Sequence, residues 1–154
     1  MAIATRRRLV IGLAFSVCAV FSTNGCKVRV GDKAENRIAE QGAESWQIDG
    51  KTYSIGSTYY LVLPPREQLQ YTIEYLVSDP KLLADLTDER AGAIAKPLMK
   101  YAWQHHLFER TQITSSKGGA LKPSLIGVAI TYRGGARSRG YRVHRSLDQI
   151  ATTH

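Results

Sequence analysis

Arginine is concentrated in the last third of the chain, on both sides of a glycine pair that predicts a tight turn. Residues 110–147 contain eight basic residues and no aspartate or glutamate, whereas residues 27–109 contain ten basic and twelve acidic residues. The planar guanidinium group binds phosphate or carboxylate through two parallel hydrogen bonds. The segment therefore predicts a surface that binds an anion or an acidic partner protein, formed by Arg133, Arg137, Arg139, Tyr141, Arg142 and Arg145.

Strand alternation limits how many of these side chains share one surface. In a regular strand, Arg137 and Arg139 lie on the same face as Tyr141, and Arg142 lies on the opposite face. A second interpretation is that the charges protect an exposed sheet edge from pairing with other sheets. Nucleic acid is the usual partner of a basic patch, but we do not expect it here because the leader described below directs the chain out of the cytoplasm.

Other residue groups that suggest chemistry have simpler explanations. Ser78 and Lys81 match the S-x-x-K pattern of serine β-lactamases, but the companion motifs S-D-N and K-T-G are missing, and Asp79-Pro80 explains the run as a helix start. His105 and His106 are adjacent, about 100° apart around a helix, which does not suit a shared metal. The sequence therefore predicts no catalytic residue, no metal and no cofactor. A small hydrolase remains the less favoured alternative.

The first 25 residues have the three parts of an export signal. A positive segment at Arg6–Arg8 precedes an apolar run from Leu9 to Phe21, and small or polar residues follow. The apolar run spans about 20 Å as a helix, too short for a hydrocarbon core of about 30 Å. Residues 1–25 are therefore predicted to be a cleavable signal peptide.

The position of the cysteines adds a prediction about modification. Cys18 leaves with the leader, so the mature chain keeps Cys26 alone, a reactive thiol in an oxidising compartment. The run Ser22-Thr23-Asn24-Gly25-Cys26 resembles a bacterial lipoprotein signal. The resemblance implies that Cys26 is acylated and anchors the chain to a membrane, and Lys27 after it implies the outer membrane, facing the periplasm. Cleavage by an ordinary signal peptidase within residues 19–25 is the alternative.

The mature chain is expected to hold one domain behind a tether. Residues 26–45 are polar and of mixed sign, which predicts a solvated tether, and residues 46–154 form the folded domain. Alternating large residues around Asp49-Gly50 predict a β-hairpin. Residues 58–63 predict a buried strand, and residues 126–132 and 141–143 predict a second hairpin.

Helices are expected between the two hairpins. Pro64-Pro65, followed by apolar residues at 69, 73, 76 and 77, predicts a helix that packs on the sheet. Asp79-Pro80 and Thr87 predict two further helix starts, and Pro97 is expected to kink or divide the second of these helices. The prediction is an α+β, two-layer domain of order β-β-β-α-α-β-β, with an antiparallel sheet of about five strands and two or three helices on one face.

These features favour a binding role over an enzymatic one. We expect a small lipid-anchored protein of the periplasm or outer membrane that binds a protein with an acidic surface. In size and anchoring the chain resembles bacterial immunity lipoproteins, so an inhibitor or immunity protein against an envelope-acting toxin is the favoured hypothesis. A structural or assembly lipoprotein of an envelope machine is the alternative.

Overall fold

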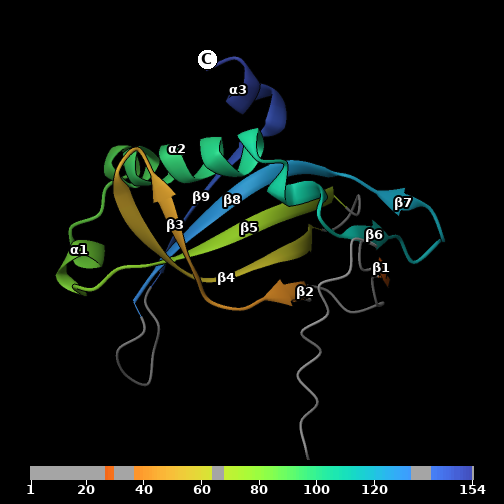
Figure 1. The fold of residues 1–154 in the computed structure, drawn as a ribbon, viewed down its shortest axis with the longest axis horizontal. Helices are drawn as coiled ribbons and strands as arrows, with labels where there is room; N and C mark the ends of the chain where they lie inside the picture. Colours follow the sequence, from red (N-terminus) through yellow and green to blue (C-terminus); the bar gives the residue numbers. More distant parts are fainter. Residues whose placement is uncertain (1–26, 30–36, 64–67, 133–139, 154) are drawn as a thin grey trace, which may run out of the picture.

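The computed structural model describes residues 27–29, 37–63, 68–132 and 140–153 (Figure 1). In these residues a six-stranded sheet has the order β2-β4-β5-β8-β9, with β3 also paired to β4. A second sheet has three short strands in the order β1-β6-β7. The bounds of the strands are β1 Lys27–Arg29, β2 Arg37–Gln41, β3 Glu44–Ile48, β4 Lys51–Leu63, β5 Gln68–Leu76, β6 Gln112–Thr114, β7 Ala120–Leu121, β8 Pro123–Thr131 and β9 Gly140–Ser146.

The helices lie between and after the strands. They are α1 Lys81–Ala84, α2 Asp88–Gln104, the 3-10 helix η1 Leu107–Glu109 and α3 Leu147–Ala151. Within the described ranges, none of them is long and apolar enough to cross a membrane. A mixed α/β architecture dominated by sheet, broadly of the predicted α+β kind, is confirmed.

The sheet differs from the prediction in direction and size. It has six strands rather than about five, and β5 pairs with β8 in parallel, whereas the other pairs of this sheet are antiparallel. The expected wholly antiparallel sheet is therefore wrong. The physical cause is the helical connection from α1 to η1, which returns the chain to the end of the sheet from which β5 started, as a parallel pair requires.

The predicted helix after Pro64-Pro65 is wrong, because residues 68–76 form strand β5. Leu69, Tyr71 and Ile73 are buried on one face of this strand, and Gln70, Thr72 and Glu74 are buried on the other. Residues 68–75 alternate polar and apolar side chains, the pattern of a strand, but the apolar residues at 69, 73, 76 and 77 also fit a helical stripe. Strand β5 lies at the centre of the sheet, with β4 on one side and β8 on the other.

The predicted hairpin at Asp49-Gly50 is confirmed. Strands β3 and β4 pair in register from Glu44 with Ile55 to Ile48 with Lys51. Asp49 and Gly50 have φ angles of 49° and 76°, as a two-residue turn with both central residues in the left-handed region requires. Residues 51–63 then form one long strand rather than two separate ones.

The segment expected to be a tether contributes to the fold. Strand β2 pairs with β4 through Ile38 and Tyr60, and β3 begins at Glu44. Pairing with β4 satisfies the backbone N–H and C=O groups of this polar segment, which could not form a core by itself. The sheet therefore includes residues from Arg37 onward, before the predicted domain start at residue 46.

The helix starts agree with the sequence. Asp79 Oδ1 accepts a 2.9 Å hydrogen bond from the backbone nitrogen of Lys81 at the start of α1, and Thr87 Oγ1 caps α2 by accepting from the nitrogen of Arg90 at 3.3 Å. Pro97 lies inside α2 without dividing it. Between β6 and β8, residues 120–121 form the short strand β7.

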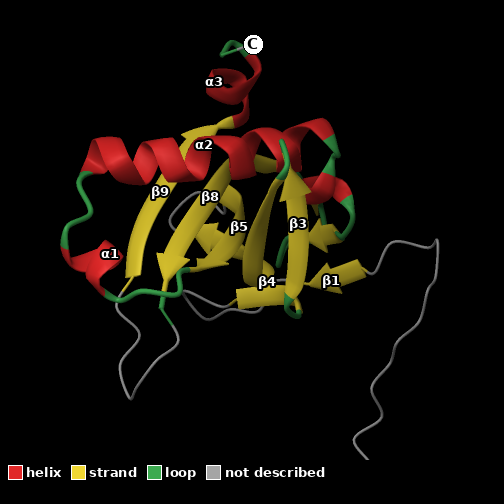
Figure 2. Ribbon diagram, turned by 60° about the vertical axis from the view of Figure 1, so that its left-hand side comes forward, coloured by secondary structure: helices red, strands yellow, loops and turns green. Residues whose placement is uncertain are grey.

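Helix α2 covers one face of the large sheet (Figure 2). It contacts β3, β8 and β9. The core on this side consists of small and apolar helix residues against β-branched strand residues, as the apolar stripe of an amphipathic helix requires. The buried helix residues are Ala91, Ala95, Leu98, Met99 and Ala102, and the strand residues include Ile73, Ile126, Val128 and Ile130.

Candidate functional site

The two arginines of the predicted cationic surface that the structure describes lie on opposite faces of strand β9. Arg133, Arg137 and Arg139 lie outside the described residues, as does the predicted lipidation site Cys26. In β9, Arg142 pairs with Ala129 and Arg145 pairs with Ile126 of β8. Because successive side chains of a strand point to opposite faces, Arg142 and Arg145 lie on different faces of the sheet. These two arginines therefore belong to two different environments.

Arg145 lines a cleft where α2, β9 and α3 meet. The cleft has a volume of about 550 Å³ and is open to solvent. Three cationic side chains line it, Lys96 and Lys100 from α2 and Arg145 from β9. Apolar side chains from all three elements complete the lining, namely Met99, Val143 and Ile150.

The geometry of α2 brings the two lysines together. Lys96 and Lys100 are four residues apart, so they lie on one face of the helix, and both are exposed. Gly92 lies one turn before Lys96, and a Cβ at Gly92 would meet no atom within 4 Å. The cleft is therefore open above this end of the helix. Neither lysine was among the predicted site residues, although their spacing of four residues places both on the polar face of α2.

Helix α3 is held beside the cleft by its first residues. The Ser146 hydroxyl accepts a 3.2 Å hydrogen bond from the nitrogen of Gln149, and Gln149 Oε1 accepts a 3.1 Å hydrogen bond from the nitrogen of Ser146. This reciprocal capping box fixes the turn from β9 into α3. It places Ile150, which is buried, between the helix and the sheet.

The lining of the cleft favours an anionic ligand. Among the described residues that line it there is no aspartate or glutamate. Pockets that bind small molecules or peptide side chains have volumes of about 300 to 1,000 Å³ and combine apolar walls with a few polar groups that fix orientation. The cleft fits this range, and its charged groups suit a carboxylate or phosphate with an apolar neighbour.

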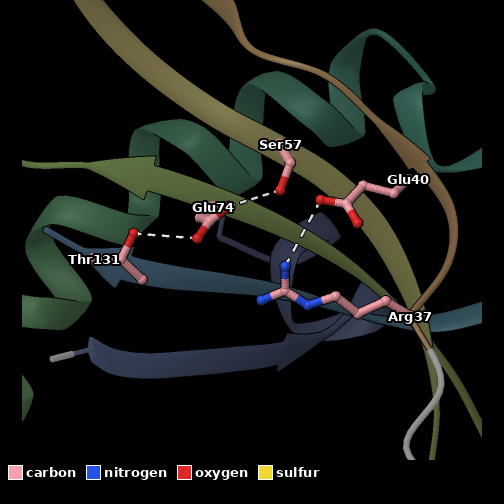
Figure 3. A network of polar contacts seen from close by, with 5 residues as sticks. All are labelled: Arg37, Glu40, Ser57, Glu74 and Thr131. Atoms are coloured by element: carbon pink, nitrogen blue, oxygen red, sulfur yellow. Dashed lines mark hydrogen bonds and ion pairs between the residues drawn. The ribbon is translucent and has the colours of Figure 1, made fainter. Parts of the chain in front are cut away.

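Arg142 belongs to the opposite face of the sheet, which is polar. Figure 3 shows Ser57, Glu74 and Thr131 side by side on three adjacent strands. Ser57 Oγ donates a 2.7 Å hydrogen bond to Glu74 Oε2, and Thr131 Oγ1 donates a longer one of 3.4 Å to Oε1. Both Ser57 and Glu74 are buried.

Tyr59 lies on the same polar face. The guanidinium carbon of Arg37 lies 4.0 Å from the centre of the Tyr59 ring, and Arg37 is also 3.7 Å from the carboxylate of Glu40. Burial raises the pKa of Tyr59, and the positive charges of Arg37 and Arg142 oppose this rise. Within the described chain, the buried Tyr59 hydroxyl has no hydrogen-bond partner.

The remaining motifs take part in local structure. Ser78 and Lys81 flank the start of α1, where the backbone of Lys81 is bound by Asp79. The His105 ring packs on Tyr101 at a centroid distance of 4.2 Å, and His106 Nδ1 lies 3.5 Å from the carboxylate of Glu109. In the described residues there is no group of three or more metal-ligating side chains.

The cationic cleft is thus the described site whose shape and charge best suit a ligand, and of the predicted site residues that the structure describes, Arg145 lines it. Tyr141 is partly buried against the core, beside Ile130. Comparison of the chain with protein-family models, with curated proteins and with solved structures finds no significant match.

Proposed function

We propose that this chain is a lipid-anchored protein of the bacterial envelope that binds an acidic partner protein through the cationic cleft, as an inhibitor or immunity protein against a toxin acting there. The observation that carries the proposal is the convergence of Lys96, Lys100 and Arg145 on one cleft without a carboxylate in its described lining. Complementary charge at an interface accelerates association and selects the partner.

The leader supports the cellular setting of this proposal. Arg6–Arg8, the apolar run and the Cys26 segment together favour export and acylation. Mass spectrometry of the mature N-terminus tests this part directly. The expected result is a diacylated Cys26 as the first residue, and loss of the lipid in Cys26→Ser. A mature chain that begins with Met1 would contradict both export and anchoring.

Charge reversal in the cleft tests the binding role. The double variant Lys96→Glu/Lys100→Glu is expected to lose its partner in co-purification from cells that produce the toxin. The matched control is Lys117→Glu/Lys122→Glu, which changes the same charge at exposed positions outside the cleft. Equal partner recovery by both double variants, at unchanged melting temperature, would contradict the cleft as the binding site.

Genetics separates the proposed role from a structural one. Deletion of the gene for an immunity protein harms the cell only when the toxin is present. Deletion of an assembly lipoprotein causes an envelope defect without any toxin. A permeability assay on the deletion strain, with and without the toxin, therefore distinguishes the two functions.

A further inference from the structure

Strand β9 is the last strand of the large sheet. It pairs with β8 along its whole length, from Gly140 with Thr131 to Ser146 with Leu125. Within the described part of the chain, no strand pairs with its other edge. An unpaired edge presents the backbone N–H and C=O groups of every second residue, and an extended peptide can bind them as an additional strand.

The side chains of β9 present positive charge on both sides of this edge. Val143 and Arg145 line the cationic cleft, while Arg142 and His144 are exposed on the opposite face. Strand β9 contains no aspartate or glutamate. A strand added beside β9 would place alternate side chains at the border of the cleft, within reach of Lys96, Lys100 and Arg145, and the others beside Arg142.

We propose that the partner binds as an extended acidic segment that adds a strand to β9 and directs alternate carboxylates toward the cleft. This inference rests on the proposed function and specifies how the partner is recognised. Backbone hydrogen bonds to β9 would provide affinity without sequence preference, and the cleft cations would select acidic side chains.

Charge also argues against a second copy of this chain as the occupant of the edge. Pairing β9 with β9 of another copy would bring together two strands that each carry two arginines and no carboxylate. Like charges opposite one another in neighbouring strands are destabilising. An acidic strand instead replaces this repulsion with attraction.

A synthetic peptide tests the inference on the full chain in a neutral detergent. The probe is an acetylated and amidated octapeptide of alternating glutamate and valine, and its binding is measured by isothermal titration calorimetry. The same peptide N-methylated at every residue keeps the side chains but loses every backbone donor, and we expect it to bind at least about tenfold more weakly. An alternating lysine and valine peptide should not bind.

Amide hydrogen exchange locates the added strand. Addition of the glutamate and valine peptide is expected to slow exchange at every second amide of residues 140–146. If the N-methylated peptide binds equally well and these amides exchange unchanged, strand addition is overturned while the cleft remains a charge-based site. If instead Lys96→Glu/Lys100→Glu binds the parent peptide unchanged, the proposed function itself fails.

A lipid control completes the test. Dihexanoyl phosphatidylglycerol, kept below its micelle concentration, offers an anionic headgroup in soluble form. We expect this lipid to leave binding of the glutamate and valine peptide unchanged. Displacement of the peptide by this lipid would overturn the inference, because it would show that the surface recognises a headgroup rather than a protein strand.

Discussion

Ser57 donates a 2.7 Å hydrogen bond to the carboxylate of Glu74, from one central strand of the sheet to the next, and both side chains are buried. A buried carboxylate is tolerated only when hydrogen bonds replace the water that it loses. The face of the sheet opposite α2 therefore depends on this pair of residues. The cleft and the core lie on the other face.

Replacing Ser57 by alanine should destabilise the fold. A hydrogen bond to a charged group contributes about 1.5 to 3 kcal/mol, so the free energy of unfolding of Ser57→Ala is expected to fall by about this amount. The matched control is Ser54→Ala, on the same strand but exposed, which should change it by less than about 0.5 kcal/mol. Urea unfolding measures both, and equal effects of the two variants would contradict the role of the Ser57 hydroxyl.

Gly127 provides room for a neighbouring side chain. A Cβ at this position would lie 3.0 Å from Cδ of Gln70 and still closer to its nitrogen, and that nitrogen donates a 3.1 Å hydrogen bond to Thr72. Gly127→Ala is therefore expected to displace the Gln70 amide and break its hydrogen bond to Thr72, at a cost of about 1 kcal/mol.

A second substitution checks this explanation of Gly127. Gln70→Ala removes the side chain that would clash, so adding Gly127→Ala to it should cost much less than Gly127→Ala alone. Gly42→Ala, where a Cβ meets no atom within 4 Å, serves as the control. Simple additivity of the two substitutions in thermal unfolding would rule out the clash.

The buried tyrosines predict alkaline unfolding. Burial raises the pKa of Tyr71 to about 12 and also raises the pKa of Tyr60 and Tyr75. Since the folded pKa exceeds the unfolded value of 10, the stabilisation is fully present below pH 10 and is lost as the pH rises toward 12. For Tyr71 the loss amounts to about 2 to 3 kcal/mol.

Tyrosinate absorbance at 295 nm, followed together with circular dichroism, measures this effect. Wild-type protein should unfold between pH 10 and 12, as the buried tyrosines ionise. The variant Tyr71→Phe should show a shallower fall of stability with pH in the same range. A stability that stays constant from pH 9 to 12 would contradict the burial argument.

Removing the cap of α3 should affect binding more than folding. Ser146→Ala breaks the capping box and costs about 0.5 to 2 kcal/mol at this helix. Because α3 contributes Gln149 and Ile150 to the cleft, affinity for the acidic octapeptide is expected to fall severalfold. Thr87→Ala removes a similar cap at the start of α2, outside the cleft. It should leave peptide affinity unchanged, and an equal loss in both variants would indicate a general effect on stability.

Local signals in the sequence were sufficient for several elements. The turn at Asp49-Gly50 and the helix starts at Asp79 and Thr87 depend on backbone conformation and hydrogen bonds within a few residues. Such features can be predicted because the residues that cause them are adjacent in the chain. The hairpin and both helix starts were correctly predicted for this reason.

The central strand β5 was wrongly predicted as a helix, although residues 68–75 alternate polar and apolar side chains as a strand does. Its apolar residues at 69, 73 and 76 also fit a helical stripe, and its second neighbour in the sheet, β8, is distant in the sequence. The cleft likewise depends on residues that are distant from one another in the sequence. Lys96 and Arg145 are 49 residues apart, and they line one cleft because β9 packs against α2.

The parallel pairing of β5 with β8 has a consequence for the order in which the chain can fold. Strand β8 enters the sheet only after residues 77–122 have been made and looped back, so the sheet depends on contacts distant in sequence, which slow folding. The local β3–β4 hairpin can form early, yet β5 keeps one edge unsatisfied until the last third of the chain arrives. Under the proposed export route, this late completion of the sheet would keep the polypeptide unfolded while it passes through a translocation channel, until its C-terminal strands have followed.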